Sequence, residues 1–344
     1  MSWSAGIDSP AASVAAKPAR MIALNHADPR HARVVLIDWM LGNHCNFACD
    51  YCPTELHDGS LPWMPVDVAT GFLDTLHDHY VAGLGRSLWL QLTGGEPTQY
   101  PGFFDLCSAA HARGIKVAVI SNGSRTARFW HRATPVLASA ILTYHDLQVD
   151  HSQFLETLGI LTGAGVPVHV NVTVHPDRFD AILERVDDIR AAGPGASLTL
   201  KPLRLGFGQE LYPYTEAQKG HLSKRQARLR SGQSVESEAL LFQRGLMARH
   251  LADGTTDTWR ANDLLLAGEN RWQGMRCHAG LESLRIKADG RVFRAVCGSG
   301  GCLGQLGQGT IDLPVLPLTC DRHSCACVAD ILITKTATQR NAAP

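Results

Sequence analysis

Three cysteines near the start of the chain are spaced as ligands of one metal centre. Cys45, Cys49 and Cys52 lie within eight residues, with three and then two residues between them. Thiolates are soft ligands that suit iron–sulfur clusters or zinc. A closed zinc site usually takes four protein ligands, and His44, as the direct neighbour of Cys45, is poorly placed to be the fourth. Three thiolates on a 4Fe–4S cubane leave one iron open to a substrate or cofactor, and we favour this interpretation over zinc.

The elements that must position this loop follow a repeating βα pattern that begins at Val34. We predict strands over residues 34–41, 87–93, 116–121, 139–144, 168–174 and 197–203. Helices are predicted between them, over 66–81, 103–113, 124–136, 152–163 and 178–192. This alternation indicates a parallel sheet with right-handed crossovers, and six units are too few to close an eight-stranded barrel. We therefore predict the α/β class, as a partial (β/α)6 TIM-like barrel with a small C-terminal Cys-rich domain. The loop after the first strand then lies at the carboxyl edge, where such folds bind ligands.

The remainder of the chain divides by composition into shorter segments. We predict a loose N-terminal arm over 1–33, the barrel over 34–210, a mostly helical connector over 211–271, the Cys-rich domain over 272–335 and a tail over 336–344. Within the Cys-rich domain, two apolar segments flank Asp289-Gly290, a dipeptide that is typical of tight hairpin turns.

The motif Cys-x₃-Cys-x₂-Cys, with the aromatic Tyr51 before its third cysteine, resembles the signature of the radical S-adenosylmethionine (SAM) superfamily. The resemblance implies that a 4Fe–4S cluster binds the amino and carboxylate groups of SAM at its open iron. One electron from the reduced cluster would cleave SAM to methionine and a 5′-deoxyadenosyl radical, which removes a hydrogen atom from the substrate. The protein would position the cofactors and exclude water. On this basis Cys45, Cys49 and Cys52 are the expected cluster ligands and catalytic residues.

Strand ends further along the chain match places where this superfamily binds SAM. Thr93-Gly94-Gly95-Glu96-Pro97 ends the second strand, and the resemblance implies that its backbone binds the SAM amino group, an approach that two glycines would permit. Ser121-Asn122-Gly123 ends the third strand and resembles a contact to the SAM carboxylate or ribose, although it could also cap the next helix. His145 could face the ribose or the substrate, or be a structural histidine. The SAM-binding set that we predict is Tyr51, Thr93, Gly94, Gly95, Glu96, Ser121, Asn122, His145 and Asn171.

Two cations end the sixth predicted strand. Lys201 and Arg204 would suit a carboxylate or phosphate of the substrate, and a salt bridge to the rim of the sheet is the alternative.

Six cysteines follow in the tail: Cys277, Cys297, Cys302, Cys320, Cys325 and Cys327. A cysteine, a hairpin, a second cysteine and a later tight group resemble the SPASM and Twitch extensions of radical SAM enzymes, which hold auxiliary 4Fe–4S clusters. Six cysteines cannot ligate two clusters fully, so we expect one auxiliary cluster. Its expected ligands are Cys277, Cys297, Cys320 and either Cys325 or Cys327. Four thiolates also suit a structural zinc ion, and this alternative stays open.

The overall composition limits the classes of partner that we expect for this protein. Lys plus Arg and Asp plus Glu each number 32, so no net charge directs the chain to nucleic acid or to an anionic membrane. We find no apolar run long enough for a membrane span and no secretion signal, and we expect a cytoplasmic protein with reduced thiols. In that compartment, cysteines serve as metal ligands more often than as disulfides.

The reaction class follows less directly. The 33 residues before the first strand are too few for a cobalamin domain or a folded peptide-recognition domain. We therefore expect hydrogen abstraction from a small molecule, such as a sugar, a nucleoside or another secondary metabolite. A SPASM- or Twitch-type peptide maturase is the alternative, and a non-catalytic iron–sulfur electron carrier is a third possibility. A reductant such as flavodoxin or ferredoxin would supply the electron.

Overall fold

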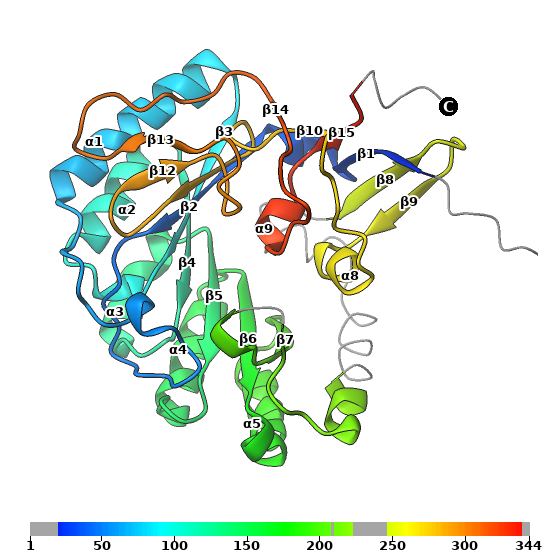
Figure 1. Ribbon diagram of the computed structural model, residues 1–344. Coiled ribbons are helices and arrows are strands. Elements are labelled where there is room, and N and C mark those ends of the chain that lie inside the picture. The colour runs from blue at the N-terminus through cyan, green and yellow to red at the C-terminus, as the bar shows by residue number, and fades with distance from the viewer. Residues whose placement is uncertain (1–19, 208–209, 223–245, 339–344) are drawn as a thin grey trace, which may run out of the picture.

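The computed structural model describes residues 20–207, 210–222 and 246–338. Parallel strands pair in chain order from β2 to β7 and form the body of the protein (Figure 1). The strands are β2 (Val34–Met40), β3 (Ser87–Thr93), β4 (Lys116–Ser121), β5 (Ser139–Tyr144), β6 (Val168–Val174) and β7 (Ser197–Pro202). This arrangement confirms the α/β class and the order of strands that the sequence predicts.

Helices cover one face of this sheet, and the alternation of side chains explains why. They are α1 (Val66–Leu76), which a π-helical segment extends over His77–Gly83, α2 (Phe103–Ala112), α3 (Ala127–Ala133), α4 (His151–Gly163) and α5 (Phe179–Ala192). In β6, Val168, Val170 and Val172 belong to the main hydrophobic core. Because successive side chains of a strand point to opposite faces, His169 and Thr173 lie on the other, inner face.

The inner face carries several polar side chains. Besides His169 and Thr173 on β6, it carries Asp38 on β2 and Lys201 on β7, since Ile37, Trp39 and Leu200 beside them belong to the core. A few polar groups among apolar ones are typical of an interior that binds a ligand.

The C-terminal part of the chain extends the same sheet. β11 (Ser283–Ile286) pairs in parallel with β2, and β12 (Arg291–Phe293) pairs antiparallel with β11 and with β13 (Cys302–Gln305). Within the described residues the sheet therefore has nine strands, in the order β13-β12-β11-β2-β3-β4-β5-β6-β7. The predicted hairpin is confirmed, and Gly290 adopts the positive φ of 82° that its turn requires. β11 also brings Arg285 to the inner face, where it forms an ion pair with Asp38.

A second sheet joins segments from both ends of the chain. In the described residues its order is β14-β10-β15-β1-β8-β9. Its strands are β1 (Met21–His26), β8 (Met247–Leu251), β9 (Thr256–Trp259), β10 (Arg276–Cys277), β14 (Leu318–Thr319) and β15 (Lys335–Thr336). β1 pairs antiparallel with both β8 and β15.

This second sheet corrects three predicted boundaries. The predicted loose arm is wrong for Met21–His26, because β1 pairs on both sides. The predicted helical connector is wrong for 247–259, where β8 and β9 form a hairpin before the short helix α8 (Ala261–Leu266). The expected boundary between the Cys-rich domain and the tail falls inside β15. Residues 1–19, 223–245 and 339–344 of these predicted segments lie outside the described residues. None of the helices in the described ranges combines the length and the apolar composition of a membrane span.

Candidate functional site

The cysteine loop follows β2 directly, and Asn43 holds it closed. The Asn43 side chain is buried, and its Nδ2 lies 2.6 Å from Asp58 Oδ1 and 3.1 Å from the Glu55 carbonyl. Its Oδ1 accepts a hydrogen bond of 3.1 Å from the backbone N–H of Leu61. One amide thus ties the beginning of the loop to its end. We did not foresee this role of Asn43, since only the folded loop brings residues 55–61 to it.

The three thiols of the loop lie near one another in a desolvated environment. Burial raises the pKa of Cys45 to about 11 and that of Cys52 to about 11, and the neighbouring cysteines raise both further. The pKa of Cys49 is raised as well, chiefly by burial. Thiols bind iron as thiolates, so binding of a metal at this place would have to displace their protons.

The Gly94-Gly95-Glu96 turn packs against the backbone that leads into Cys45. The backbone N–H of Glu96 donates to the His44 carbonyl at 2.6 Å. A Cβ atom at Gly95 would lie 2.0 Å from the same oxygen, and one at Gly94 would lie 2.4 Å from the Gly42 carbonyl. Both glycines are therefore required for close contact between two protein segments. The structure thus shows a packing reason for both glycines, and the predicted contact of Gly95 with SAM stays a prediction.

The Glu96 carboxylate joins the ends of β3 and β4. It is buried and accepts hydrogen bonds from the Thr98 backbone and hydroxyl, from the Ser121 hydroxyl at 2.8 Å and from the Asn122 backbone at 2.7 Å. Burial raises the pKa of Glu96, while these donors oppose that shift. The side chains of Glu96 and Ser121 are thus engaged within the protein, so their predicted SAM contacts would have to come from the backbone.

Asn122 connects the end of β4 to the first cysteine. Its Nδ2 donates to Asn46 Oδ1 at 3.0 Å and lies 3.9 Å from Cys45 Sγ, while its Oδ1 accepts from the Ser124 backbone. The alternative prediction, that this segment caps the next helix, is wrong, because α3 begins at Ala127 with Thr126 as its N-cap, and the Asn122 side chain closes only a local turn.

His145, after β5, reaches the second half of the cysteine loop. Its Nδ1 lies 2.5 Å from the Tyr51 hydroxyl and 3.7 Å from Cys49 Sγ, and burial lowers its pKa to about 4. The Tyr51 hydroxyl is also 3.4 Å from the hydroxyl of Thr173, which donates to the Tyr144 carbonyl. A neutral histidine therefore lies beside the thiols, and the predicted residues Tyr51 and His145 come together. Thr173, which sequence reasoning missed, extends this contact to β6.

Residues from four strand ends thus converge on one loop with three thiols. Residues 39–189, which contain all of them, match the family described as the radical SAM superfamily. This stretch is a radical SAM domain.

Two curated relatives and a solved structure resemble the chain. An S-adenosylmethionine-dependent nucleotide dehydratase of a Thermoplasmatales archaeon is 22% identical over 219 residues, which are 64% of this chain and 65% of the relative. An AdoMet-dependent heme synthase of Methanosarcina barkeri is 27% identical over 175 residues, 50% of this chain and 42% of the relative. The chain therefore spans less than two thirds of each curated relative. The structure of native anSMEcpe with bound AdoMet shares the fold, with a TM-score of 0.51 and 15% identity over 79% of this chain and 78% of that one.

The donor set of the radical SAM domain fits a 4Fe–4S cluster. Burial raises the pKa of all three thiols of the loop, with a contribution from neighbouring cysteines for Cys45 and Cys52, and the loop lies at the carboxyl edge of the sheet. Across residues 20–207, 210–222 and 246–338, no three His, Cys, Asp or Glu side chains converge closely enough to hold a single metal ion. A 4Fe–4S cubane does not require its ligands to converge on one point, because each cysteine binds a different iron.

Four of the tail cysteines lie together. Burial raises the pKa of Cys325 to about 12, and the nearby Cys297 and Cys277 raise it further. Burial likewise raises the pKa of Cys297 to about 12, with a contribution from Cys277, which itself neighbours Cys320. Cys277 and Cys320 are both buried in one small apolar cluster. The group thus contains the three predicted auxiliary-cluster ligands Cys277, Cys297 and Cys320, together with Cys325, one of the two alternatives for the fourth ligand.

The other two tail cysteines point elsewhere. Cys302 is exposed and donates to the Gly304 carbonyl at 3.3 Å. Cys327 begins α9 (Val328–Ile331), and its charged neighbours are Asp330, Asp38 of β2 and Lys201 of β7. Figure 1 shows α9 on the side of the sheet away from α1–α5. The start of α9 therefore faces the inner side of the barrel, between its first and last strands.

A buried lysine lies beside the four-cysteine group. Lys335 has no exposed surface, and its Nζ donates to the carbonyls of Asp330, Ile331 and Ile333 at 2.7, 3.1 and 2.7 Å. Its charge lowers the pKa of Cys277 and of Cys325, against the larger effect of burial. The group thus contains a fixed positive charge that would favour thiolates.

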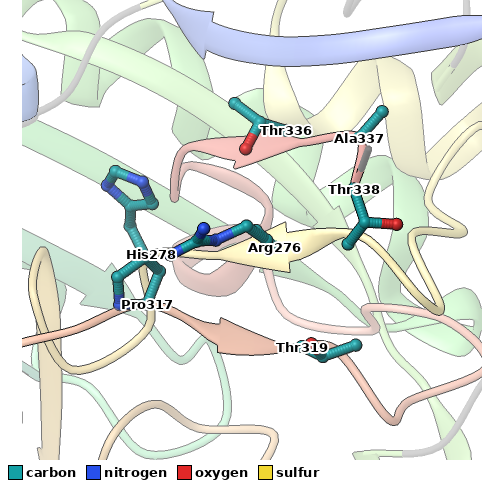
Figure 2. Close-up of a pocket in the computed structure, with 7 residues that line it drawn as sticks. All are labelled: Arg276, His278, Pro317, Thr319, Thr336, Ala337 and Thr338. Carbon is teal, nitrogen blue, oxygen red and sulfur yellow. The ribbon is translucent and has the colours of Figure 1, made fainter. Parts of the chain in front are cut away.

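One hollow on the surface lies apart from the radical SAM site. It measures about 770 Å³ and lies against the second sheet (Figure 2). It is lined by Arg276, His278, Pro317, Thr319, Thr336, Ala337 and Thr338. None of the predicted site residues lines this hollow, so it does not bear on the chemistry of the cysteine loop.

The remaining predicted residues occupy the inner face or its rim. Asn171 lies on the inner face of β6 and is hydrogen-bonded to His169. Lys201 lies on the inner face of β7. Arg204 belongs to the loop after β7, where it pairs with Leu211. The predicted role of Lys201 and Arg204 in binding a substrate anion stays a prediction.

Proposed function

We propose that this protein is a radical SAM enzyme that binds a 4Fe–4S cluster through Cys45, Cys49 and Cys52 and abstracts hydrogen from a small-molecule substrate held in the barrel. When bound, the cluster supplies the electron that cleaves SAM to methionine and a 5′-deoxyadenosyl radical. The observation that carries the proposal is the contact between the three-thiol loop and the Gly94–Glu96 turn, through the hydrogen bond from Glu96 N to His44 O.

The residues around the loop support distinct tasks. Three cysteine ligands would leave one iron of a cubane without a protein ligand, and the turn after β3 and the end of β4 would supply backbone groups for the SAM amino and carboxylate groups. His145 and Tyr51, with Asn171 deeper in the barrel, are the side chains we propose for the ribose or adenine. The helix-covered sheet and the cysteine loop would keep water from the reacting atoms, as radical chemistry requires.

The test is anaerobic reconstitution with iron, sulfide and SAM, followed by reduction with dithionite and measurement of 5′-deoxyadenosine. We expect Cys45→Ala, Cys49→Ala and Cys52→Ala each to abolish its formation. Cys107→Ala is the matched control, because Cys107 is a buried core residue of α2 and should leave the activity in place. Formation of 5′-deoxyadenosine at the wild-type rate by any variant of the loop cysteines would refute the proposal. No formation by the wild-type protein would indicate an electron carrier instead.

We further propose that Cys277, Cys297, Cys320 and Cys325 bind an auxiliary 4Fe–4S cluster, while Cys327 does not. The support is that the first four lie near one another, with Cys277, Cys320 and Cys325 buried and Cys297 partly buried, and that Cys327 faces the barrel. The protein carrying Cys45→Ala, Cys49→Ala and Cys52→Ala should still bind about four irons, as one cubane requires. Adding Cys325→Ala should remove them, and adding Cys327→Ala should not. Zinc without iron in the triple variant would identify a zinc module instead.

A peptide is the alternative substrate class. The structure of Streptococcus suis SuiB bound to the precursor peptide SuiA has a TM-score of 0.50 to this chain, at 12% identity over 78% of this chain and 61% of that one. This likeness concerns the fold alone, so the proposal stays with a small molecule. Flavodoxin or ferredoxin is the reductant that we propose, and replacing dithionite by either protein in the same assay tests this.

A further inference from the structure

Lys201 places a positive charge inside the barrel. It lies near the carboxyl end of β7, between the core residues Leu200 and Leu203, and points to the inner face. The side chain keeps solvent-accessible surface, yet desolvation lowers the pKa of its ammonium group. Lys201 is thus a residue that water reaches although protein groups surround its ammonium group closely enough to desolvate it.

The other charges of the inner face are compensated within the protein. Asp38 pairs with Arg285, and the Glu96 carboxylate accepts four hydrogen bonds at the strand ends. Within the described ranges, no carboxylate lies within ion-pair distance of Lys201, and its Nζ donates no hydrogen bond to another side chain or to the backbone. The Cys327 thiol, at the start of α9, is a further neighbour of Lys201.

The position of Lys201 is close to the proposed radical site. Lys201 is the register partner of Thr173 on β6, so the two side chains lie next to each other on the inner face, one strand spacing of about 4.8 Å apart. The Thr173 hydroxyl is 3.4 Å from the hydroxyl of Tyr51, which directly precedes Cys52. An anion held by Lys201 would therefore lie within one small molecule's length of the cysteine loop.

We propose that Lys201 binds an anionic group, a carboxylate or a phosphate, of the substrate. This inference rests on the proposed function and adds the chemical class of the substrate. An ammonium group without a counter-charge in a partly dehydrated interior gains most from an anionic ligand, because the ligand restores the interaction that water gave it.

The first experiment measures protection of Lys201 in the reconstituted protein with SAM bound. Acetylation by an amine-reactive ester is followed at each lysine by peptide mass spectrometry, with and without inorganic phosphate or succinate. We expect saturating anion to slow the acetylation of Lys201 by about tenfold, the effect of one charge-assisted contact. Lys219 is the internal control, because it is paired with Glu216 at 2.8 Å on an exposed helix and should not change. Protection by phosphate alone indicates a phosphorylated substrate, and protection by succinate alone indicates a carboxylate.

The second experiment locates the anion relative to the cluster. Once reduced, the cluster is paramagnetic, and it should speed the nuclear relaxation of bound phosphate phosphorus or succinate protons. Lys201→Met should abolish this effect and Lys201→Arg should keep it, while both variants keep the SAM affinity of the wild type. If neither anion protects Lys201, or if Lys201→Met weakens SAM binding as much as anion binding, the assignment is wrong. If the reconstituted wild-type protein forms no 5′-deoxyadenosine, the proposed function itself is wrong.

Discussion

The packing of Gly95 on the cysteine loop predicts the outcome of a one-carbon change. In Gly95→Ala, the new Cβ would lie 2.0 Å from the His44 carbonyl oxygen, 2.5 Å from the carbonyl carbon and 2.9 Å from the His44 nitrogen. Real Cβ atoms do not approach backbone atoms so closely. Because all three atoms belong to the main chain, no rotation of a side chain relieves the contact. The loop or the turn after β3 has to move.

The structure allows the cost to be worked out. Overpacking of this kind costs about 1–3 kcal/mol. Separating the two segments also lengthens the hydrogen bond of 2.6 Å from Glu96 N to His44 O, which contributes about 1 kcal/mol. We therefore expect Gly95→Ala to lower the free energy of unfolding by about 2–4 kcal/mol. Since His44 is bonded directly to Cys45, the displacement should also reduce the iron bound at the loop.

The assay is urea unfolding of the iron-free protein, followed by iron determination after anaerobic reconstitution. Gly71→Ala is the matched control, because Gly71 lies in α1 and a Cβ there meets nothing within 4 Å. A glycine-to-alanine change in an open helical position should stabilise the protein by about 0.5–1 kcal/mol and leave the iron content unchanged. Gly95→Ala should thus lower the free energy of unfolding and Gly71→Ala should raise it, although the chemical change is the same.

One result would refute this reasoning. If Gly95→Ala unfolds like the wild type, retains full iron and loses only SAM affinity, then Gly95 serves the approach of SAM, as the resemblance alone had led us to expect. A loss of stability together with iron supports the packing role.

Three further predictions concern the inner face and the tail. Burial and the charge of Lys201 lower the pKa of His169 to about 3, so this histidine is neutral in the folded protein, while the unfolded chain binds a proton below about pH 6.5. The free energy of unfolding should therefore fall as pH decreases from about 6.5 towards 3, and His169 should account for a loss of about 1.4 kcal/mol at pH 5.5. His169→Gln should remove this part of the pH dependence in urea titrations. Arg285→Met leaves Asp38 partly buried without its partner and should destabilise by about 3–5 kcal/mol, whereas adding Asp38→Asn should restore part of the loss in a double-mutant cycle. Lys335→Met leaves three carbonyl oxygens without their donor, at about 1–3 kcal/mol each, and removes a charge that favours the Cys277 thiolate. In the variant without the loop cysteines, Lys335→Met should therefore lower the metal bound by the tail, and an unchanged metal content would contradict this.

The central strands could be predicted residue by residue. β3, β4, β5 and β6 begin and end where the sequence predicts, because short apolar segments between helical segments identify buried parallel strands locally. Since parallel strands place their carboxyl ends at one edge, the same pattern also predicts that Cys45, the Gly94–Glu96 turn, Asn122 and His145 meet there, as they do.

Other features depend on contacts between residues that are far apart in the chain. β1 reads as a short, weakly patterned segment, and only its pairing with β8 and β15, more than 200 residues away, makes it a strand. The parallel pairing of β11 with β2 has no local signal either, so the ion pair between Asp38 and Arg285 was not foreseen.

Within the candidate site, the sequence determined the residue types and the tertiary structure decided their tasks. The spacing of Cys45, Cys49 and Cys52 identifies a metal loop, since ligands so close in sequence converge for local reasons. That Gly95 packs on His44, and that Cys325 rather than Cys327 lies beside Cys277 and Cys297, depends on which distant backbone packs beside each residue. Such choices rest on steric fit and on burial between separate segments, and these arise only when the chain has folded.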